Sequence, residues 1–592
     1  MTEKTNYTQS PWKLDDLFKN FEDPAIEETY KKVDALVAQF ESYREQLKAD
    51  IKESDFLKVL KDLEIVNKLG IKIGGFAELS FAGDTQSQKA QIASARFKQF
   101  SADMSNRTIF FTLWWKALDD KNAKRLMDAS GDYRYWLQQM RNFKDYTLSE
   151  PEEKIINIKD VTGSSALSML YDSITNRYTF KVEVDGEEKD LTRGEVMTLV
   201  HTADPDIRAK AYQELYKVYG DDGPILGQIY QALVRDWRNE NISLRGFKKP
   251  ISVRNLVNDI PDSVVDTLLD ITRKNSGIFQ RFFALKARLL GMEKLRRYDI
   301  YAPLAKSDKT YSFNEATEIT FDAFTEFDAN FSNLAQRVLK DDHLDSEVRK
   351  GKMSGAFCAT ITPDLTPWVL LNYQGKPGDI ATMAHELGHA VHSMMAEEHT
   401  YFTQHACLPL AETASTFGEM VLLDRLMQLE KDESVKRDIL FRQMDDAFAT
   451  ILRQIYFALF ERKAHEMILN DASIDEISDA YLENLKEEFG DSVEISDEFR
   501  WEWVSIPHIY QVPFYVYAYA FGQLLVFSLY KQYKVEGEAF KPRFMKILAA
   551  GGSVAPIELL ADAGIDVTKA EFWQGGFDVI EEMVSKLEEI SK

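Results

Sequence analysis

The segment His385-Glu386-Leu387-Gly388-His389 has the residue types and the spacing of a zinc site. In a helix, residues four apart share one face, so His385 and His389 can offer both imidazoles to one metal ion, with Glu386 beside them. Two ligands and a carboxylate base from one helical turn suit hydrolysis by a metal-activated water. The turn at 376–379 supplies an N-cap, and 380–396 has a strong helical pattern, so the sequence predicts a helix here.

A catalytic zinc ion needs a third protein ligand, and the residue type of that ligand separates the enzyme classes. An extended H-E-x-x-H-x-x-G-x-x-H site would need Gly at position 392 and His at position 395. The chain has His392 and Met395 there, so this class of site is excluded. The third ligand must come from another segment.

The segment 408–419 offers a carboxylate from a second predicted helix, with Pro409 in its first turn. Glu412, Ser415 and Glu419 fall on one face of that helix. We predict that Glu412 is the third ligand, since 397–407 is long enough for a reversal that packs the second helix antiparallel to the first. Glu419, two turns further on, is placed to hold a ligand histidine by its other ring nitrogen.

The blocks NYQGKPGDIATMAHELGHAVHS and LPLAETASTFGE resemble the oligoendopeptidase F branch of the M3 metallopeptidases, relatives of thimet oligopeptidase and neurolysin. The family pattern is H-E-[FL]-G-H-x-x-H followed by E-x-x-S-x-x-x-E. The matching residues are His385, Glu386, His389, His392, Glu412, Ser415 and Glu419. Segments 351–356 and 506–510 are also similar, so the resemblance covers most of the C-terminal two-thirds of the chain. It implies one zinc ion and places His392 and Glu419 around its ligands.

The expected chemistry is hydrolysis of a peptide bond. Zinc lowers the pKa of a bound water to roughly 7, and Glu386 can take its proton and return it to the leaving amine. In the family, a histidine and tyrosines of a late segment stabilise the oxyanion. The resemblance assigns this task first to His508 and second to Tyr515 or Tyr517, because a neutral hydroxyl can strengthen its hydrogen bond as charge develops.

Composition agrees with a soluble intracellular enzyme. The 592-residue chain is 45% hydrophobic, and its formal net charge of −24 argues against nucleic acid as a partner, since phosphate binding needs clustered Lys and Arg. The N-terminus lacks the pattern of a signal peptide, and Cys358 and Cys407 imply no disulfide framework, so we expect a cytoplasmic protein. The uncharged stretch 503–530 is long enough for a membrane span, but its prolines and tyrosines favour a buried helix lining a polar cavity.

The N-terminal part of the chain is predicted to be helical. The clearest helical patterns cover Glu27–Glu41, Asp55–Leu69 and Thr85–Met104. A β-hairpin follows, with strands at 178–184 and 187–191 around an Asp185-Gly186 turn. A capping box at Thr192 and the Asp204-Pro205 pair restart helices. We divide the chain into an N-terminal helical region, 1–200, and a catalytic zinc peptidase region, 201–592.

Two short strands, 355–361 and 368–372, are predicted just before the metal helix. An extended peptide could add to the edge of such a sheet and be held by its backbone. The family resemblance implies a mainly α, two-lobed fold around a deep substrate channel, with a small β-sheet beside the active site.

These observations favour a zinc-dependent endopeptidase that cuts internal bonds of short unfolded oligopeptides. An exopeptidase of the same architecture, either a dipeptidyl carboxypeptidase or a carboxypeptidase, is the close alternative. A non-catalytic peptide-binding protein is disfavoured, because a binder has no need for Glu386. The sequence leaves the oligomeric state open.

Overall fold

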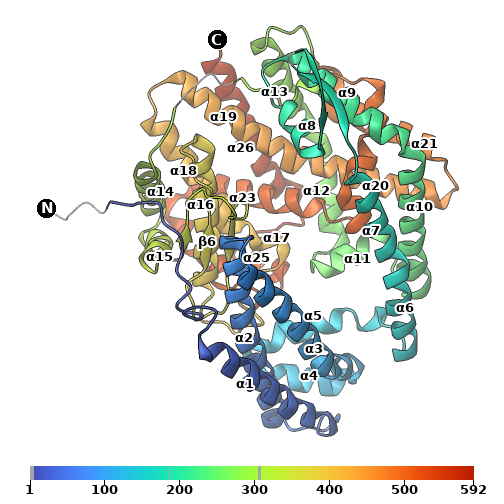
Figure 1. Ribbon diagram of the computed structural model, residues 1–592, viewed down its shortest axis with the longest axis vertical. Coiled ribbons are helices and arrows are strands. Elements are labelled where there is room, and N and C mark those ends of the chain that lie inside the picture. Colours follow the sequence, from blue (N-terminus) through green and yellow to red (C-terminus); the bar gives the residue numbers. More distant parts are fainter. Residues whose placement is uncertain (1–5, 185, 305–308) are drawn as a thin grey trace. The chain divides into compact units, whose positions relative to one another are not determined.

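The computed structural model describes residues 6–184, 186–304 and 309–592, and it is mainly helical with small sheets, as predicted (Figure 1). The chain divides into two compact units. Unit 1 comprises Met1–Lys144, Asp308–Glu430 and Gln532–Asp566, and unit 2 comprises Asp145–Ser307, Lys431–Lys531 and Val567–Lys592. Both units are therefore built from segments that are distant in sequence. The division of the chain near residue 200 into an N-terminal and a catalytic region stays a prediction.

Unit 1 contains a helical N-terminal part and a small sheet flanked by helices. Its elements are α1 (Pro24–Glu41), α2 (Glu53–Gly83), α3 (Gln88–Ala117), α4 (Asp120–Asp128), α5 (Arg134–Asn142), α14 (Phe313–Phe327), α15 (Ala329–Lys340), β4 (Leu344–Asp345), β5 (Phe357–Ala359), β6 (Trp368–Leu370), α16 (Pro377–Met395), α17 (Leu408–Ala411), α18 (Thr413–Leu429), α24 (Lys541–Ala549) and α25 (Pro556–Asp562). Helix α23 (Tyr517–Glu536) crosses from unit 2 into unit 1.

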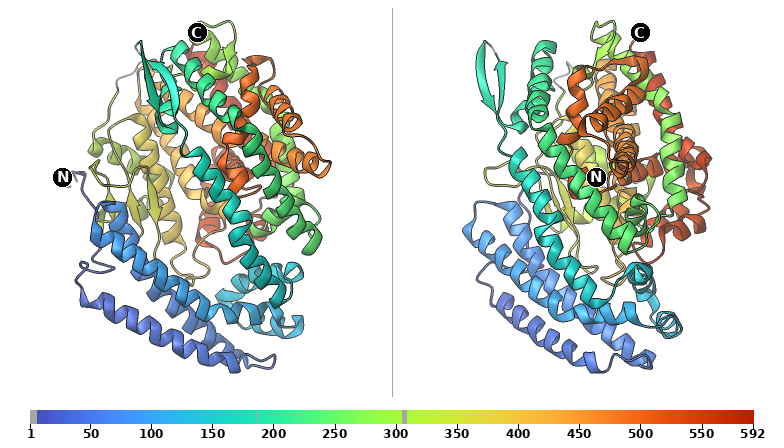
Figure 2. Two further views of the ribbon diagram at one scale, coloured as in Figure 1. Left: turned by 45° about the vertical axis from the view of Figure 1, so that its right-hand side comes forward. Right: turned by 90° about the vertical axis from the view of Figure 1, so that its right-hand side faces the viewer.

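Helices α1, α2 and α3 lie side by side in unit 1 (Figures 1 and 2). Helix α1 begins with Asp23 as its N-cap and buries Tyr30, Val33, Val37 and Phe40, which recur at helical spacing. Glycines allow α2 to pack closely, since a Cβ atom at Gly74 would lie 2.4 Å from the ring of Phe97 on α3. All three predicted N-terminal helices are confirmed, and α2 and α3 extend further than their sequence patterns.

The sheet of unit 1 has the order β4-β6-β5. Strand β4 pairs parallel with β6, and β5 pairs antiparallel with β6, with Cys358 opposite Val369. Both predicted strands are therefore confirmed, although each is shorter than its pattern. Strand β6 is completely buried, whereas β5 is an edge strand that contacts α16. The sheet thus lies directly beside the helix that carries the H-E-x-x-H motif.

Unit 2 is helical apart from two small sheets. Its elements are α6 (Glu150–Thr162), α7 (Ser164–Thr175), β1 (Phe180–Val184), β2 (Glu187–Leu191), α8 (Arg193–Leu199), α9 (Pro205–Asp221), α10 (Gly223–Arg238), α11 (Pro250–Val257), α12 (Asp262–Lys274), α13 (Ser276–Leu289), β3 (Leu295–Arg296), α19 (Glu433–Ala447), α20 (Arg453–Leu469), α21 (Ile474–Phe489), β7 (Val493–Glu494), α22 (Pro507–Gln511) and α26 (Ala570–Ile590). Strands β1 and β2 form the predicted antiparallel hairpin against α8 and α9 (Figure 2), while Asp185 of its predicted turn lies outside the described residues.

A buried ion-pair cluster fixes the segment that leads into α22. Glu502 lies in a 3₁₀ segment, Asp497–Ser505, and accepts hydrogen bonds from Arg297 at 2.6 Å and from Arg453 at 2.9 Å. Glu502 and Arg297 are each 1% exposed, so this pairing compensates charges that would be costly alone in the core. The uncharged stretch after it forms α22 and most of α23. No helix in the described part of the chain is long and apolar enough to cross a membrane.

Candidate metal centre

Helix α16 carries the H-E-x-x-H motif and begins three residues earlier than predicted. Pro377 occupies its first turn and Lys376 is the N-cap. Asp379 lies in the first turn of the helix, and its carboxylate accepts the backbone N–H groups of Gln374 at 2.8 Å and of the N-cap residue Lys376 at 3.0 Å. The predicted turn is therefore the first turn of the helix, stabilised by its own acidic side chain.

Helices α16 and α18 pack in close contact through two glycines. A Cβ atom at Gly388 would lie 2.5 Å from Ser415 Cα, and one at Gly418 would lie 3.2 Å from the Ala384 carbonyl oxygen. Because contacts move backward along α16 as they move forward along α18, the two helices run antiparallel, as predicted. This close approach brings Glu412, just before α18, and Glu419, on α18, within reach of the histidines on α16.

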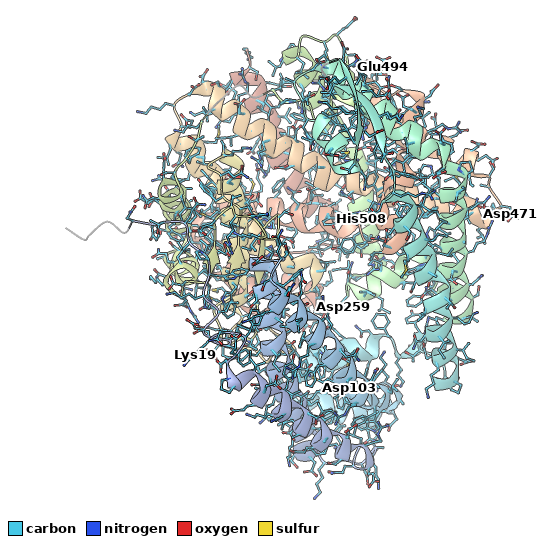
Figure 3. The ribbon with its side chains drawn as sticks, in the orientation of Figure 1. Lys19, Asp103, Asp259, Asp471, Glu494 and His508 are labelled. Carbon is cyan, nitrogen blue, oxygen red and sulfur yellow. The ribbon has the colours of Figure 1, made fainter. Side chains whose placement is uncertain are left out.

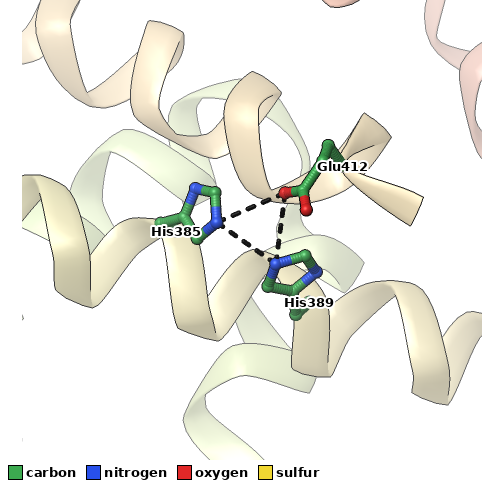
Figure 4. A group of neighbouring side chains, drawn as sticks. All are labelled: His385, His389 and Glu412. Carbon is green, nitrogen blue, oxygen red and sulfur yellow. Dashed lines mark hydrogen bonds and ion pairs between the residues drawn. The ribbon is translucent and has the colours of Figure 1, made fainter. Parts of the chain in front are cut away.

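The three predicted ligands, His385, His389 and Glu412, meet in one triangle (Figure 4). His385 Nε2 lies 3.2 Å from His389 Nε2, and each of these atoms lies 3.3 Å from Glu412 Oε2. Ligand atoms at about 2.0–2.1 Å from a tetrahedral zinc ion lie about 3.3–3.4 Å apart, so the donor types and their spacing fit zinc. Among the described residues, this is the only group of three or more His, Cys, Asp or Glu side chains placed to hold a metal ion.

The electrostatics of the triangle favour a cation. Burial lowers the pKa of His385, but the carboxylates of Glu412 and Glu419 outweigh burial and raise this pKa to about 10. Burial raises the pKa of Glu412, yet hydrogen bonds from the two imidazoles outweigh burial and hold its pKa well below the usual range. The Glu412 carboxylate therefore stays ionised beside the two imidazoles, as a ligand for a cation must be.

Glu412 differs from its predicted setting. The sequence predicts one continuous helix through Glu412, but α17 ends at Ala411 and α18 begins at Thr413. Glu412 occupies the junction, with φ −84° and ψ 3°. Its contact with Ser415 is nevertheless made, because Ser415 Oγ donates to Glu412 Oε2 at 2.8 Å. The hydroxyl thus holds the carboxylate oxygen that faces both histidines.

Glu419 and His392 lie around the ligands. Glu419 Oε1 is 2.6 Å from His385 Nδ1, so the carboxylate orients the ring and leaves Nε2 for the metal. Its spacing of seven residues from Glu412 was the signal for this contact. His392 is buried, and burial lowers its pKa to about 4, which keeps its ring neutral near pH 7.

Glu386 faces a cavity of about 520 Å³ beside the triangle. The side chain is 7% exposed, and burial raises its pKa. The cavity is lined by Ala356, Phe357, Cys358, Ala359, Thr360, Glu386, His389, His392, Ser393, Gln404, His405, Ala406 and Ala411. A buried carboxyl group that shares a cavity with a metal ligand is placed to exchange protons with a molecule bound there.

Gln404 and His405 were missed by sequence reasoning. They line the cavity from the 397–407 connection, which reads in sequence only as a reversal. This connection is anchored by Asp132, whose carboxylate is 2.8 Å from His399 Nδ1 and accepts the Thr400 N–H at 2.7 Å. No local pattern signals these contacts, because Asp132 is far away in sequence.

The late aromatic residues belong to unit 2, with His508 on α22 (Figure 3). The rings of His508 and Tyr515 are parallel, with centroids 6.1 Å apart, and the ring of Tyr519 is 5.2 Å from that of Tyr515. Tyr517 is completely buried, and its hydroxyl accepts a hydrogen bond from Asn258 at 2.9 Å. The structure therefore groups His508 and Tyr515 with a third residue, Tyr519, which sequence analysis did not single out. The side chain of Tyr517 points into the core of unit 2 instead.

Two family models match the chain. The model described as "Peptidase family M3" matches residues 198–579, and the model described as "Oligopeptidase F" matches residues 114–180. The first match covers more than half of the chain and includes every residue predicted to act at the site.

Several bacterial proteins are similar over most of the chain. "Group B oligopeptidase PepB" of Streptococcus agalactiae is 27% identical over 530 residues, which are 88% of this chain and 87% of the relative. "Oligopeptidase PepF" of Bacillus subtilis is 25% identical over 595 residues, which are 98% and 87% of the two chains. An "Oligoendopeptidase F homolog" of Borreliella burgdorferi is 27% identical over 601 residues, which are 98% of each chain.

Solved structures share the fold. A peptidase from Chlamydophila abortus matches with a TM-score of 0.89 and 23% identity, covering 98% of this chain and 100% of its own. Oligoendopeptidase-F from Enterococcus faecium matches with a TM-score of 0.70 and 24% identity, covering 96% of this chain and 99% of its own.

Proposed function

The chain belongs to peptidase family M3, and from this premise we propose that it is a zinc-dependent endopeptidase acting on internal bonds of short, unfolded oligopeptides. The family resemblance predicted from the sequence is thereby confirmed. The observation that carries the proposal is the triangle of His385, His389 and Glu412, with the buried carboxyl group of Glu386 beside it.

His385, His389 and Glu412 would hold the metal, with Glu419 fixing one imidazole and Ser415 fixing the carboxylate. Zinc bound there supplies Lewis-acid chemistry, polarising the peptide carbonyl and making water nucleophilic near neutral pH. A set of three protein ligands would suit a catalytic zinc site, whereas structural zinc sites have four.

Glu386 is the proposed general base and acid. It would take a proton from the attacking water and deliver it to the leaving amine. Burial raises the pKa of this carboxyl toward the range in which both transfers are efficient. A protein that only bound peptides would not need a carboxyl group at this position.

His508 and Tyr515 are the proposed donors to the oxyanion. Burial lowers the pKa of His508, so near pH 7 the ring is neutral and can donate from one nitrogen. Tyr517, the other tyrosine considered for this task, is held in the core by Asn258. We therefore assign the task to the two residues whose rings lie together.

The substrate is proposed to bind in an extended conformation along β5. This edge strand supplies Phe357, Cys358 and Ala359 to the cavity that also contains Glu386. Backbone pairing with an edge strand gives affinity with loose sequence preference, which suits an oligopeptidase. We place the enzyme in the reducing cytoplasm, in line with a sequence that contains only two cysteines, Cys358 and Cys407.

Mass spectrometry of a peptide mixture tests the proposal. Peptides with free and with blocked termini are incubated with the zinc-loaded protein, with and without a chelator, and with Glu386→Gln as the control for contaminating peptidases. We expect chelator-sensitive internal cuts in blocked peptides. Cuts only near free termini would reassign the protein to the exopeptidases, and no cuts would leave a peptide-binding protein.

A further inference from the structure

The segment between α22 and α23 contains a residue in an unfavourable backbone conformation. Phe514 has a φ of +57°, in the left-handed region that favours glycine, and its side chain is 1% exposed. A bulky residue persists there only when its surroundings over-determine the conformation, and such residues concentrate at functional sites. Phe514 directly precedes Tyr515.

A buried carboxyl group holds this conformation. Both oxygens of Glu461, on α20, lie within hydrogen-bonding distance of the Phe514 backbone N–H, at 2.9 and 3.0 Å. The Glu461 side chain is completely buried. On the other side, Arg254 Nε donates to the Pro513 carbonyl oxygen at 3.3 Å. The N–H of Phe514 thus has a specific acceptor inside the core instead of water.

The held backbone sets the aromatic residues. Tyr515 donates its backbone N–H to the Val512 carbonyl at 3.2 Å, and Val512 donates to the His508 carbonyl at 2.8 Å. Any rotation at Phe514 would therefore move Tyr515 relative to His508. The rings of these two residues are parallel at 6.1 Å, an arrangement that depends on this backbone path.

We propose that Glu461 is a positioning residue for peptide hydrolysis: by accepting the Phe514 N–H, it fixes the turn that sets Tyr515 beside His508. The proposal rests on the proposed function, in which these two residues stabilise the oxyanion. Glu461 acts only through the backbone, since its side chain has no access to substrate. Burial raises the pKa of Glu461 to about 8, and a carboxyl group accepts this hydrogen bond in either protonation state.

The decisive comparison uses Glu461→Met, which removes the acceptor at similar volume, and Glu461→Gln, which keeps a carbonyl oxygen. Activity is measured on a blocked, internally quenched fluorescent peptide, together with zinc content. Glu461→Met should lower kcat about 10–100-fold with KM changed less than about threefold and zinc retained, because a small displacement of a catalytic group costs that much. Glu461→Gln should stay within about threefold of wild type.

The matched control is Glu488→Met on α21. Glu488 is also a buried carboxyl group, 1% exposed, and burial raises its pKa to about 8 as well. It lies outside the hydrogen bonds of the Phe514 turn, so its replacement should leave kcat unchanged. An equal loss of kcat in this control would overturn the specific role of Glu461 in favour of a general effect of removing buried acids.

Coupling to Tyr515 separates positioning from general destabilisation. In a Tyr515→Phe background, Glu461→Met should add less than about threefold, because both changes act on the same hydroxyl. Full multiplication of the two effects would overturn the proposal. If Glu461→Met does not fold, Glu461→Asp replaces it: the shorter side chain withdraws its oxygens from Phe514, and wild-type kcat in this variant would overturn the proposal.

Failure of the proposed function gives a different result. Full activity of both His508→Ala and Tyr515→Phe would remove the aromatic pair from catalysis, and with it the basis for Glu461. Loss of activity in Tyr515→Phe with full activity in Glu461→Met would overturn only the role of Glu461.

Discussion

The metal centre in unit 1 and the aromatic cluster in unit 2, formed by His508, Tyr515 and Tyr519, hold reactive side chains by different means. In the metal centre, side chains fix side chains: Glu419 orients His385, and Ser415 holds Glu412. In the aromatic cluster, ring contacts are combined with a backbone turn fixed from the core. A site of the first kind should respond mainly to changes in neighbouring side chains, and one of the second kind to changes that alter backbone geometry.

The largest effect is expected at the metal centre itself. Glu412→Ala removes the only carboxylate of the triangle, so zinc occupancy should fall, and activity should fall at least about 10³-fold at limiting zinc. Metal analysis and kinetics of the purified variant measure both. Full zinc occupancy would show that another residue is the third ligand.

Glu386→Gln should lose at least about 10³-fold in kcat while keeping its zinc, because the amide cannot exchange a proton. This variant separates holding the metal from using it. The measurement is kcat together with zinc content, and turnover near the wild-type level would take the base role away from Glu386.

His508→Ala tests the aromatic cluster and should lower kcat about 10²–10³-fold, the usual cost of removing one oxyanion donor. Zinc content should be unchanged, since the metal ligands lie on other elements. The control is Tyr517→Phe, which should change kcat less than about threefold because its hydroxyl serves Asn258. A larger loss in Tyr517→Phe than in His508→Ala would invert the assignment.

Glu419→Ala should weaken zinc affinity about 10–100-fold, because His385 loses the acceptor that orients its ring. Competition with a chelator of known affinity measures the change, with Gln428→Ala on the same helix as control. An unchanged zinc affinity would mean that helix packing alone orients His385. The metal centre would then differ less from the aromatic cluster in how its side chains are held.

The smallest effect is expected in the connection between the metal helices. Burial raises the pKa of Asp132, but hydrogen bonds from His399, Thr400 and Thr403 outweigh burial and lower this pKa to about 2. The hydrogen bond between Asp132 and His399 also raises the pKa of His399. Asp132→Asn should lower the stability of unit 1 by about 1–3 kcal/mol.

The pH dependence of that loss has a defined sign. The raised pKa of His399 contributes stability that is complete below its unfolded value of about 6.5 and is lost as pH rises through the folded value. The lowered pKa of Asp132 contributes stability that is present above about pH 4 and is lost as pH falls toward 2. Thermal unfolding should therefore separate wild type and Asp132→Asn most at pH 5–6 and less at pH 9; a larger gap at pH 9 would contradict the ion pair.

Sequence reasoning worked where the geometry is helical and local. The spacing of His385 and His389 and of Glu412 and Glu419 leads to the observed contacts, since helical periodicity fixes which residues share a face. It missed the helix break at Glu412, because Pro409 fits the first turn of a helix that would run on through Glu412 and Ser415.

The features that sequence reasoning missed or could not separate depend on tertiary packing. Gln404 and His405 line the cavity from a segment that Asp132 holds through His399 and Thr400, and nothing in the sequence relates Asp132 to this segment. Phe514 has a left-handed backbone conformation, whereas a phenylalanine is normally expected at negative φ. Glu461, which holds this conformation, is 53 residues away in sequence. Burial likewise distinguishes Tyr517 from Tyr515, which sequence treats as equivalent.

Unit 1 is built from three separate segments of the chain, and this bears on its biosynthesis. Helix α16 packs against α24, and Phe417 on α18 packs against Phe544 with ring centroids 4.2 Å apart. Helix α24 and Phe544 are synthesised well after α16 and α18. At about 5–20 residues per second, α16 is complete roughly 10–30 s before α24. We therefore expect the nascent chain to acquire zinc only near the end of translation, so that a truncated product would lack the support needed to retain the ion.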